Sequence, residues 1–409
     1  MTNENYNIDD EIQAGFNALE ASINIANENL DEGLINDVEF RKTINEVINA
    51  TVNDVLSSIT DKLHITEYVT KHKELSKIYN ARADSMVSFD ISKLTAKNKY
   101  QSYLKSLNRE RKNKVMTGFT QFDDEIGGIS SGLTIITALS SLGKSSMCSQ
   151  LADQIAMAGN KVIYLNAEMQ DSHIFSKSIT RLSGKYHQLS FYDILNIKDC
   201  QFMPKVDSFV NSIEDYNTFS DNIVITQASK FWNTELRKYI KELTKINNDK
   251  PPVVFIDYLQ ILPSIADSRA NGNELVAINE IISELKNIIQ ETGAYIIAIS
   301  SLSRASYERG ITMSSLKGSG NLEYSAEMIL SIEPSRDDTC DGMPIFDNKK
   351  GVFNMDLINT WKRLDNKTVS LRVLKNRMGI TGYSSNLTFE SSKAKFTEII
   401  SNTHHPYHS

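Results

Sequence analysis

Cysteine is scarce in this sequence: Cys148, Cys200 and Cys340 are the only three among 409 residues, and they lie far apart. An odd and dispersed set excludes a disulfide framework and a zinc site, and it favours a reducing compartment. Long apolar runs are also missing, since no stretch approaches the roughly 20 residues of a membrane-spanning helix. The N-terminus has neither a basic flank nor an apolar core, which excludes a signal peptide. We therefore expect a cytoplasmic protein (in the bacterial host cell, if it is viral) without a membrane partner.

Proline and glycine are nearly absent from the first part of the chain. Residues 1–115 contain no proline and only two glycines, Gly15 and Gly33. Apolar residues recur there at helical spacing, as at Ile12, Phe16, Leu19 and Ile23 and again from Val38 to Ile59. This pattern predicts two or three amphipathic helices arranged as an αα-hairpin. We assign residues 1–90 to a small all-α domain that serves as a packing or docking surface.

Positive charge is scarce at the N-terminus and concentrated later. Residues 1–60 contain 12 acidic residues against Arg41 and Lys42, so the rest of the chain carries +3 of the net charge of −7. Residues 93–114 contain eight basic residues against Glu110. Binding of a polyanion is therefore expected in the second part of the chain. Residues 91–115 form either a linker helix that docks on another surface or a solvated basic helix.

After the linker, strand-like and helix-like stretches alternate. Four apolar runs are continuous, at residues 161–165, 222–226, 252–256 and 294–299, and a clear helix is predicted at 275–292. Continuous runs indicate strands that are buried on both faces of a parallel sheet, which favours a doubly wound α/β domain. Four later stretches alternate and predict partly antiparallel strands, at residues 327–333, 352–357, 368–375 and 384–389. We place this domain at residues 116–395, followed by a polar tail at 396–409 that includes His404, His405 and His408.

A phosphate-binding loop is predicted at Ala138-Leu139-Ser140-Ser141-Leu142-Gly143-Lys144-Ser145-Ser146. It lies between a β-branched strand at 133–137 and a helix at 146–156, the layout of a phosphate loop. Backbone N–H groups converge there on one anion. Lys144 supplies a cation for the β- and γ-phosphates of ATP, and the Ser145 hydroxyl is a ligand for Mg²⁺. Ala138 stands where the pattern has its first glycine.

Two carboxylates follow buried strands of the same domain. Asp257 ends the run at 252–256, where it can hold Mg²⁺ together with Ser145. Glu168 follows the run at 161–165, where it can activate the attacking water as a general base. An isolated Asp or Glu in either place would instead be a turn or helix cap.

Two further cations, Lys375 and Arg377, lie at the end of a predicted strand. A spacing of two residues places both on one strand face, with Asn376 on the other. Like charges repel there unless a polyanion lies between them, and a nucleotide triphosphate on an adjacent subunit is such a polyanion. A solvated strand end before a turn at Gly379 is the alternative.

The chain resembles the DnaB-type replicative helicases, a RecA-like ATPase family. The matching stretches occur in family order over about residues 115–390: Thr117-Gly118-Phe119, Gly127-Gly128, residues 138–145, 166–169, Ile256-Asp257-Tyr258-Leu259-Gln260, residues 298–304, 316–323 and Lys375-Asn376-Arg377-Met378-Gly379. Ile-Asp-Tyr-Leu-Gln together with Lys-x-Arg-x-Gly is far more specific than the phosphate loop alone. The resemblance implies a RecA-like domain with a mostly parallel central sheet.

The resemblance also implies an ATP-driven ring, usually a hexamer, that translocates 5′ to 3′ on single-stranded DNA. Lys144, Ser145, Glu168 and Asp257 would come from one subunit, and Lys375 and the arginine finger Arg377 from the next. The loop at Lys317, Gly318, Ser319 and Gly320 would face the channel and contact DNA, together with Arg304. The linker would dock on a neighbour. A separate primase and a helicase loader are implied as further partners.

The sequence departs from the family in three places. The N-terminal part shows no specific match to the family's collar domain, and the channel loop at Lys317-Gly318 lacks the usual acidic neighbour. The third departure is at residue 301. Ser300-Ser301-Leu302-Ser303-Arg304 stands where the family has Ser-Gln-Leu-Asn-Arg, so a candidate γ-phosphate sensor is missing. Two alternatives to a helicase therefore stay open. One is a RecA-like ATPase that binds single strands without unwinding duplexes, and the other is a non-catalytic subunit that joins or blocks a helicase ring.

Overall fold

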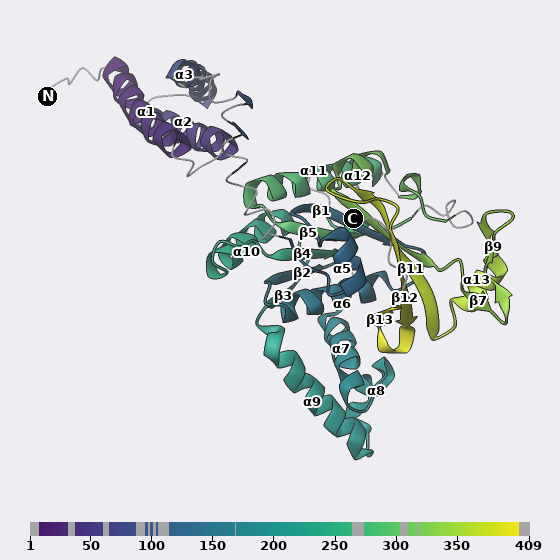
Figure 1. Cartoon of the computed structure of the whole chain (residues 1–409). Coiled ribbons are helices and arrows are strands. Elements are labelled where there is room, and N and C mark those ends of the chain that lie inside the picture. Colours follow the sequence, from purple (N-terminus) through teal and green to yellow (C-terminus); the bar gives the residue numbers. More distant parts are fainter. Residues whose placement is uncertain are drawn as a thin grey trace. The chain divides into compact units, whose positions relative to one another are not determined.

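A computed structural model describes the two parts of the chain. The described residues are 8–31, 37–59, 65–86, 95–96, 99–100, 104, 114–167, 169–263, 274–302, 310–316 and 319–400. The chain divides into two compact units, residues 1–108 and 109–409 (Figure 1). This division falls inside the segment predicted as a linker. The tail histidines and most of the basic segment lie outside the described residues.

The long helices described in the first unit are α1 (Ile8–Asp31), α2 (Asp37–Ile59) and α3 (Ile65–Met86). They enclose one apolar core that includes Leu19, Ile23, Ile48, Val52, Leu56, Leu75 and Tyr79. The Tyr79 ring packs against Phe16 with the ring centroids 5.0 Å apart. A Cβ at Gly15 would lie 2.1 Å from the Tyr79 hydroxyl oxygen, so glycine is required for this close approach. The prediction of an amphipathic helical domain is confirmed by these described helices.

The second unit is built on a nine-stranded sheet. Its strands, in sheet order, are β13 (Lys395–Glu398), β12 (Ser384–Glu390), β11 (Asn366–Asn376), β6 (Met328–Pro334), β1 (Gly132–Ala138), β5 (Tyr295–Ser300), β4 (Val253–Asp257), β2 (Val162–Asn166) and β3 (Ile223–Gln227). The pairs from β6 to β3 are parallel, and β11, β12 and β13 continue the sheet in antiparallel pairs. The predicted mostly parallel α/β fold is confirmed.

Burial along the strands follows their place in the sheet. All residues of β1, β2, β4 and β5 are buried, as the continuous apolar runs predict. The expectation of two buried faces was wrong for β3, which is only half-buried. The reason is its position at the end of the sheet, where it has one neighbouring strand.

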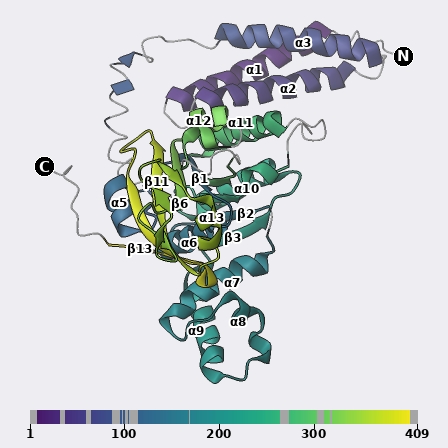
Figure 2. The same cartoon turned by 90° about the vertical axis from the view of Figure 1, so that its right-hand side faces the viewer.

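Helices cover both faces of this sheet (Figures 1 and 2). The α-helices described in this unit are α5 (Thr120–Ile126), α6 (Lys144–Met157), α7 (Asp171–Leu182), α8 (Phe191–Leu195), α9 (Met203–Ser220), α10 (Trp232–Ile246), α11 (Glu274–Thr292), α12 (Ser319–Ser325) and α13 (Met355–Trp361). Helix α6 packs under the parallel strands, and α11 packs on β1 and β5 from the other side (Figure 1). The parallel strands therefore lie between two helical layers.

Two element boundaries in the second unit differ from those predicted from the sequence. The strand predicted at 352–357 is only a two-residue strand, β10 (Val352–Phe353), because the Asn354 side chain accepts N–H groups and caps α13 directly afterwards. It pairs with β9 (Phe346–Asp347), and a second small hairpin joins β7 (Thr339–Cys340) to β8 (Met343–Pro344). The predicted tail also starts too early, because β13 extends to Glu398. Its Phe396 is buried, and the Gln150 side chain hydrogen bonds to both the N–H and the carbonyl of Phe396.

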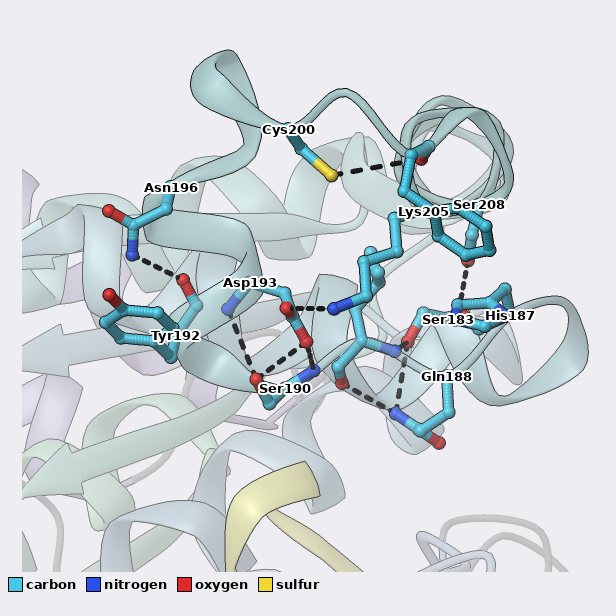
Figure 3. Close-up of polar contacts among 12 residues, drawn as sticks. Ser183, His187, Gln188, Ser190, Tyr192, Asp193, Asn196, Cys200, Lys205 and Ser208 are labelled. Atoms are coloured by element: carbon cyan, nitrogen blue, oxygen red, sulfur yellow. Dashed lines mark hydrogen bonds and ion pairs between the residues drawn. The ribbon is translucent and has the colours of Figure 1, made fainter.

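Helices α7, α8 and α9 form a lobe that projects beyond the sheet (Figures 1 and 2). Figure 3 shows how its short helix α8 is held: the Ser190 hydroxyl accepts the Asp193 N–H, and Asp193 accepts the Ser190 N–H in return. Lys205 at the start of α9 donates to the same carboxylate. Burial raises the pKa of Asp193, but the hydrogen bonds from Lys205 and Ser190 outweigh it and lower this pKa to about 2.

We expect Asp193→Asn to destabilise the second unit by about 1 kcal/mol at pH 6, as loss of a helix cap does. The pKa of Asp193 is lowered to about 2 in the folded chain, so its contribution is complete above the unfolded-state pKa near 4. The difference between variant and parent should therefore shrink as the pH falls from about 4 towards 2. Urea unfolding at several pH values measures it. Asp207→Asn, which removes an exposed acid on α9, is the control, and an equal effect of both changes would contradict the prediction.

Candidate active site

The loop predicted to bind phosphate lies between β1 and α6. Gly143 precedes α6 with a φ of 77°, and a Cβ on it would lie 2.5 Å from the Phe389 ring. Only glycine therefore fits there. Ala138 is the last residue of β1 and is buried in extended conformation, so the missing glycine causes no backbone strain. The Lys144 ammonium donates to the Ala138 carbonyl at 3.2 Å, across the loop.

Asp257 lies beside this loop at the end of β4. Its side chain is buried and accepts hydrogen bonds from the Ser145 hydroxyl and, at 3.1 Å, from the Tyr164 hydroxyl. Burial raises the pKa of Asp257, whereas the Ser145 hydrogen bond and the charges of Lys177 and Lys144 oppose that rise. A hydroxyl and a carboxylate side by side are oxygen ligands that suit Mg²⁺. The residues present therefore fit a magnesium ion held by Ser145 and Asp257.

The strand end next to β4 brings a second polar turn to the same edge. The Ala167 N–H donates to the Asp257 carbonyl at 3.0 Å. The buried Asn166 side chain accepts the Met169 N–H at 2.9 Å and donates to the Met169 carbonyl, so it joins residues 166 and 169. Lys177 of α7 approaches the Met169 sulfur at 3.5 Å. Glu168, the predicted general base, lies between these residues in sequence but outside the described residues.

The end of β5 completes this edge of the sheet. Gln260 follows β4 and donates to the Ser300 hydroxyl at 2.9 Å, and it accepts the Ser301 N–H at 3.2 Å. A buried glutamine therefore joins the ends of β4 and β5 beside Ser301. Gln260 ends the Ile256-Asp257-Tyr258-Leu259-Gln260 stretch, but no pattern in the sequence predicts this contact. Lys177 and Tyr164 were likewise missed, because their proximity to Asp257 depends on packing.

Lys375 and Arg377 lie at the opposite edge of the sheet. The Arg377 N–H donates to the Glu327 carbonyl, and the Glu327 N–H donates to Leu133 near the start of β1. The phosphate loop follows the far end of β1, roughly 15 Å further along the strand. The structure therefore brings together Lys144, Ser145 and Asp257, but it separates them from Lys375 and Arg377 of the same chain.

The two cations do share one surface, as their spacing predicts. Both contact the end of α12 and the residues directly after it: Lys375 donates to the Glu323 carbonyl, and Arg377 donates to the Tyr324 carbonyl. Arg377 also pairs with the Glu327 carboxylate at 2.8 Å. Burial and the neighbouring Arg377 lower the pKa of Lys375, while Glu327 and Glu323 oppose that shift.

The predicted DNA-binding residues are described only in part. Arg304, Lys317 and Gly318 lie outside the described residues. Ser319 and Gly320 form the first turn of α12, and Gly320 is exposed. A bridge between Leu302 and Leu316 holds the flanks of this region together.

Clusters of metal-ligating side chains and membrane-spanning helices are both absent from the described residues. Among the described residues, no three His, Cys, Asp or Glu side chains lie close enough together to hold a metal ion. A metal ion at this site would therefore be held by Ser145, Asp257 and the phosphates of a bound nucleotide. In the same part of the chain, no helix is both long and apolar enough to cross a membrane.

Comparison with known proteins identifies relatives of this chain. Replicative DNA helicase DnaB of Haemophilus influenzae is 28% identical over 225 residues, which cover 53% of this chain and 46% of that protein. Replicative DNA helicase DnaB of Rickettsia prowazekii is 25% identical over 369 residues, covering 87% of this chain and 71% of that protein. In the first of these matches the chain spans about half the length of its relative.

Solved structures share the fold of the second unit. One of them, an ATPase domain, superposes with a TM-score of 0.59 at 20% identity, covering 75% of this chain and 99% of that one. A DnaB-like replicative helicase, solved with its interactions with primase, gives a TM-score of 0.57 at 18% identity, covering 87% and 79%. Residues 114–398 match the family described as DnaB-like helicase C terminal domain. Because this match covers more than half of the chain, the protein belongs to the DnaB-like helicase C-terminal domain family.

Proposed function

We propose that this protein is an ATP-dependent, ring-forming replicative DNA helicase that translocates on single-stranded DNA and unwinds duplex DNA. One observation carries the proposal: the phosphate loop and the pair Lys375 and Arg377 lie at opposite edges of one sheet. A single chain cannot bring them to one nucleotide. A second copy can place its pair against the phosphate loop of the first, and a closed ring repeats that contact.

The residues have separate roles in this proposal. Lys144 and the loop N–H groups bind the β- and γ-phosphates of ATP, and Ser145 and Asp257 hold Mg²⁺. The metal, when bound, neutralises charge on the phosphate oxygens. Glu168 orients and deprotonates the attacking water. Lys375 and Arg377 of the next subunit stabilise the charge that develops on the transferred phosphoryl group.

The proposed DNA contacts rest on the glycine-containing stretch before and at the start of α12. Lys317 and Gly318 precede α12 in the sequence, and Ser319 and Gly320 are its first residues. We assign these four residues, with Arg304, to contacts with one DNA strand. Glycines let a backbone approach phosphates closely, and a lysine from each subunit adds a phosphate contact. We further propose a separate primase, since a relative was solved with its interactions with primase. A separate loader and a cytoplasmic setting complete the proposal.

Duplex unwinding separates this proposal from an ATPase that only binds single strands. A forked duplex with a labelled strand, incubated with ATP and Mg²⁺, measures strand displacement directly. ATPase activity that DNA stimulates without any displacement would favour the binding ATPase, and absence of both activities would favour a non-catalytic ring subunit.

Lys144→Ala should abolish ATP hydrolysis and weaken ATP binding, because the cation of the phosphate loop is lost. Hydrolysis and binding of a non-hydrolysable ATP analogue measure the two effects. Lys245→Ala, which removes an exposed lysine of α10, is the control for loss of one positive charge. A Lys144→Ala variant that hydrolyses ATP at near the parental rate would show that the phosphate-loop assignment is wrong.

Lys317→Ala should weaken binding of single-stranded DNA and flatten its salt dependence, because each subunit of a ring loses one phosphate contact. Basal ATPase without DNA should change little, whereas DNA stimulation should fall. Titration of a labelled oligonucleotide at several salt concentrations measures this. Lys350→Ala, at an exposed lysine, is the matched control. Unchanged affinity together with an unchanged salt slope would remove Lys317 from the DNA contact.

Arg377→Ala should bind ATP but lose turnover by about 10³- to 10⁵-fold, as expected for an arginine finger. Because the residue acts on the neighbouring subunit, mixing is diagnostic. Rings mixed from Lys144→Ala and Arg377→Ala subunits, each inactive alone, should regain ATPase at boundaries with both residues intact. Arg363→Ala, at an exposed arginine, is the control. A monomer that hydrolyses ATP would contradict the trans arrangement.

A further inference from the structure

Within its own subunit, the pair Lys375 and Arg377 already has a set of partners. All of them lie in the last turn of α12 or directly after it. Lys375 donates to the Glu323 carbonyl, and Arg377 donates to the Tyr324 carbonyl. The Arg377 guanidinium also pairs with Glu327 at 2.8 Å, while the two backbones are joined at 3.0 Å.

These contacts supply hydrogen-bond donors to carbonyl groups at the C-terminal end of α12. The last carbonyls of a helix have no partner within the helix, and cations stabilise them and the negative end of the helix dipole. Helix α12 extends from Ser319 to Ser325, so its N-terminus directly follows Lys317 and Gly318 in the sequence. One seven-residue helix therefore has the proposed DNA loop at its start and the proposed trans-acting cations at its end.

Arg377 cannot serve both sets of partners at once. Its guanidinium donates to Glu327 and to the Tyr324 carbonyl, and to reach a phosphate of the neighbouring subunit it has to leave them. We propose that Glu327 is a positioning residue that holds Arg377 against α12, so that nucleotide in the neighbouring subunit and the end of α12 compete for the same side chain. This inference rests on the proposed function of Arg377.

The strength of the pair suits a contact that breaks and re-forms. The Arg377 side chain is 47% exposed and the Glu327 side chain 33% exposed. Ion pairs exposed to this degree change an equilibrium by a factor of about two to five. Such a contact holds Arg377 in place between turnovers. It adds only a small barrier to movement of the side chain towards the nucleotide of the neighbouring subunit.

The competition links two surfaces of one subunit. When Arg377 leaves, the Tyr324 carbonyl loses a donor and α12 loses one tie to the end of β11. When DNA is bound at the loop that begins α12, the position of this helix in turn biases whether Arg377 returns. DNA stimulation of ATPase then arises partly from release of Arg377.

Glu327→Gln tests this coupling, because it keeps the shape of the side chain and removes its charge. We expect basal ATPase without DNA to rise about two- to five-fold, since Arg377 leaves its own subunit more readily. The ratio of DNA-stimulated to basal rate should fall by the same factor. A rise in turnover is a result that structural damage does not produce.

Two comparisons make the experiment specific. Asp337→Asn, which removes an exposed acid after β6, should leave the basal rate unchanged. In an Arg377→Ala background, Glu327→Gln should produce no rise, because the side chain that it releases is absent. Full-length protein, ATP with Mg²⁺ and a poly-dT oligonucleotide are used throughout, with ring mass in the presence of nucleotide and thermal unfolding as checks of assembly.

The outcomes separate this inference from the proposed function. If assembled Glu327→Gln rings show an unchanged or lower basal rate while Arg377→Ala is inactive, the arginine finger stands and the competition is refuted. If Arg377→Ala hydrolyses ATP at the parental rate, the trans role itself fails, whatever Glu327→Gln does. A rise that persists in the Arg377→Ala background would also overturn the inference.

Discussion

The reversal of strand direction at β11 constrains where functional residues can meet in the second unit. Strands β1, β4 and β5 are parallel, so their carboxyl ends bring the phosphate loop, Asp257 and Ser300 to one edge. β11 pairs with β6 in the antiparallel sense, so its end lies where β6 and β1 begin. The loop proposed to bind phosphate and the cations proposed to stabilise its transfer are thus kept apart by the backbone itself. No change of side-chain conformation closes that separation.

The edge with the phosphate loop depends on support from the end of the chain. The rings of Phe389 and Phe396 stack with centroids 4.2 Å apart, and Phe389 fills the space above Gly143. Gln150, in the helix that follows the loop, hydrogen bonds to both backbone polar groups of Phe396. The loop conformation is therefore fixed by strands β12 and β13, which lie more than 200 residues later in the sequence.

The opposite edge is built differently. Arg377 and Lys375 are held by carbonyl groups and one exposed carboxylate, which are contacts of modest strength. At the phosphate loop, by contrast, Asp257 is buried and hydrogen bonded from two sides. This difference suits an active site formed between two subunits. The buried loop edge would bind the nucleotide, and the loosely held pair Lys375 and Arg377 would contact it reversibly.

Local chemistry in the sequence determined the elements and most of the site. Continuous β-branched runs predicted the parallel strands, and Gly143, Lys144 and Ser145 predicted the phosphate loop, because these signals depend only on neighbours in the chain. The spacing of Lys375 and Arg377 predicted their common surface for the same reason. Tertiary structure alone decided that β3 is a half-buried edge, that Gln260 joins two strand ends and that Glu327 holds Arg377. Those outcomes depend on strand order and on contacts between distant segments, which no local pattern encodes.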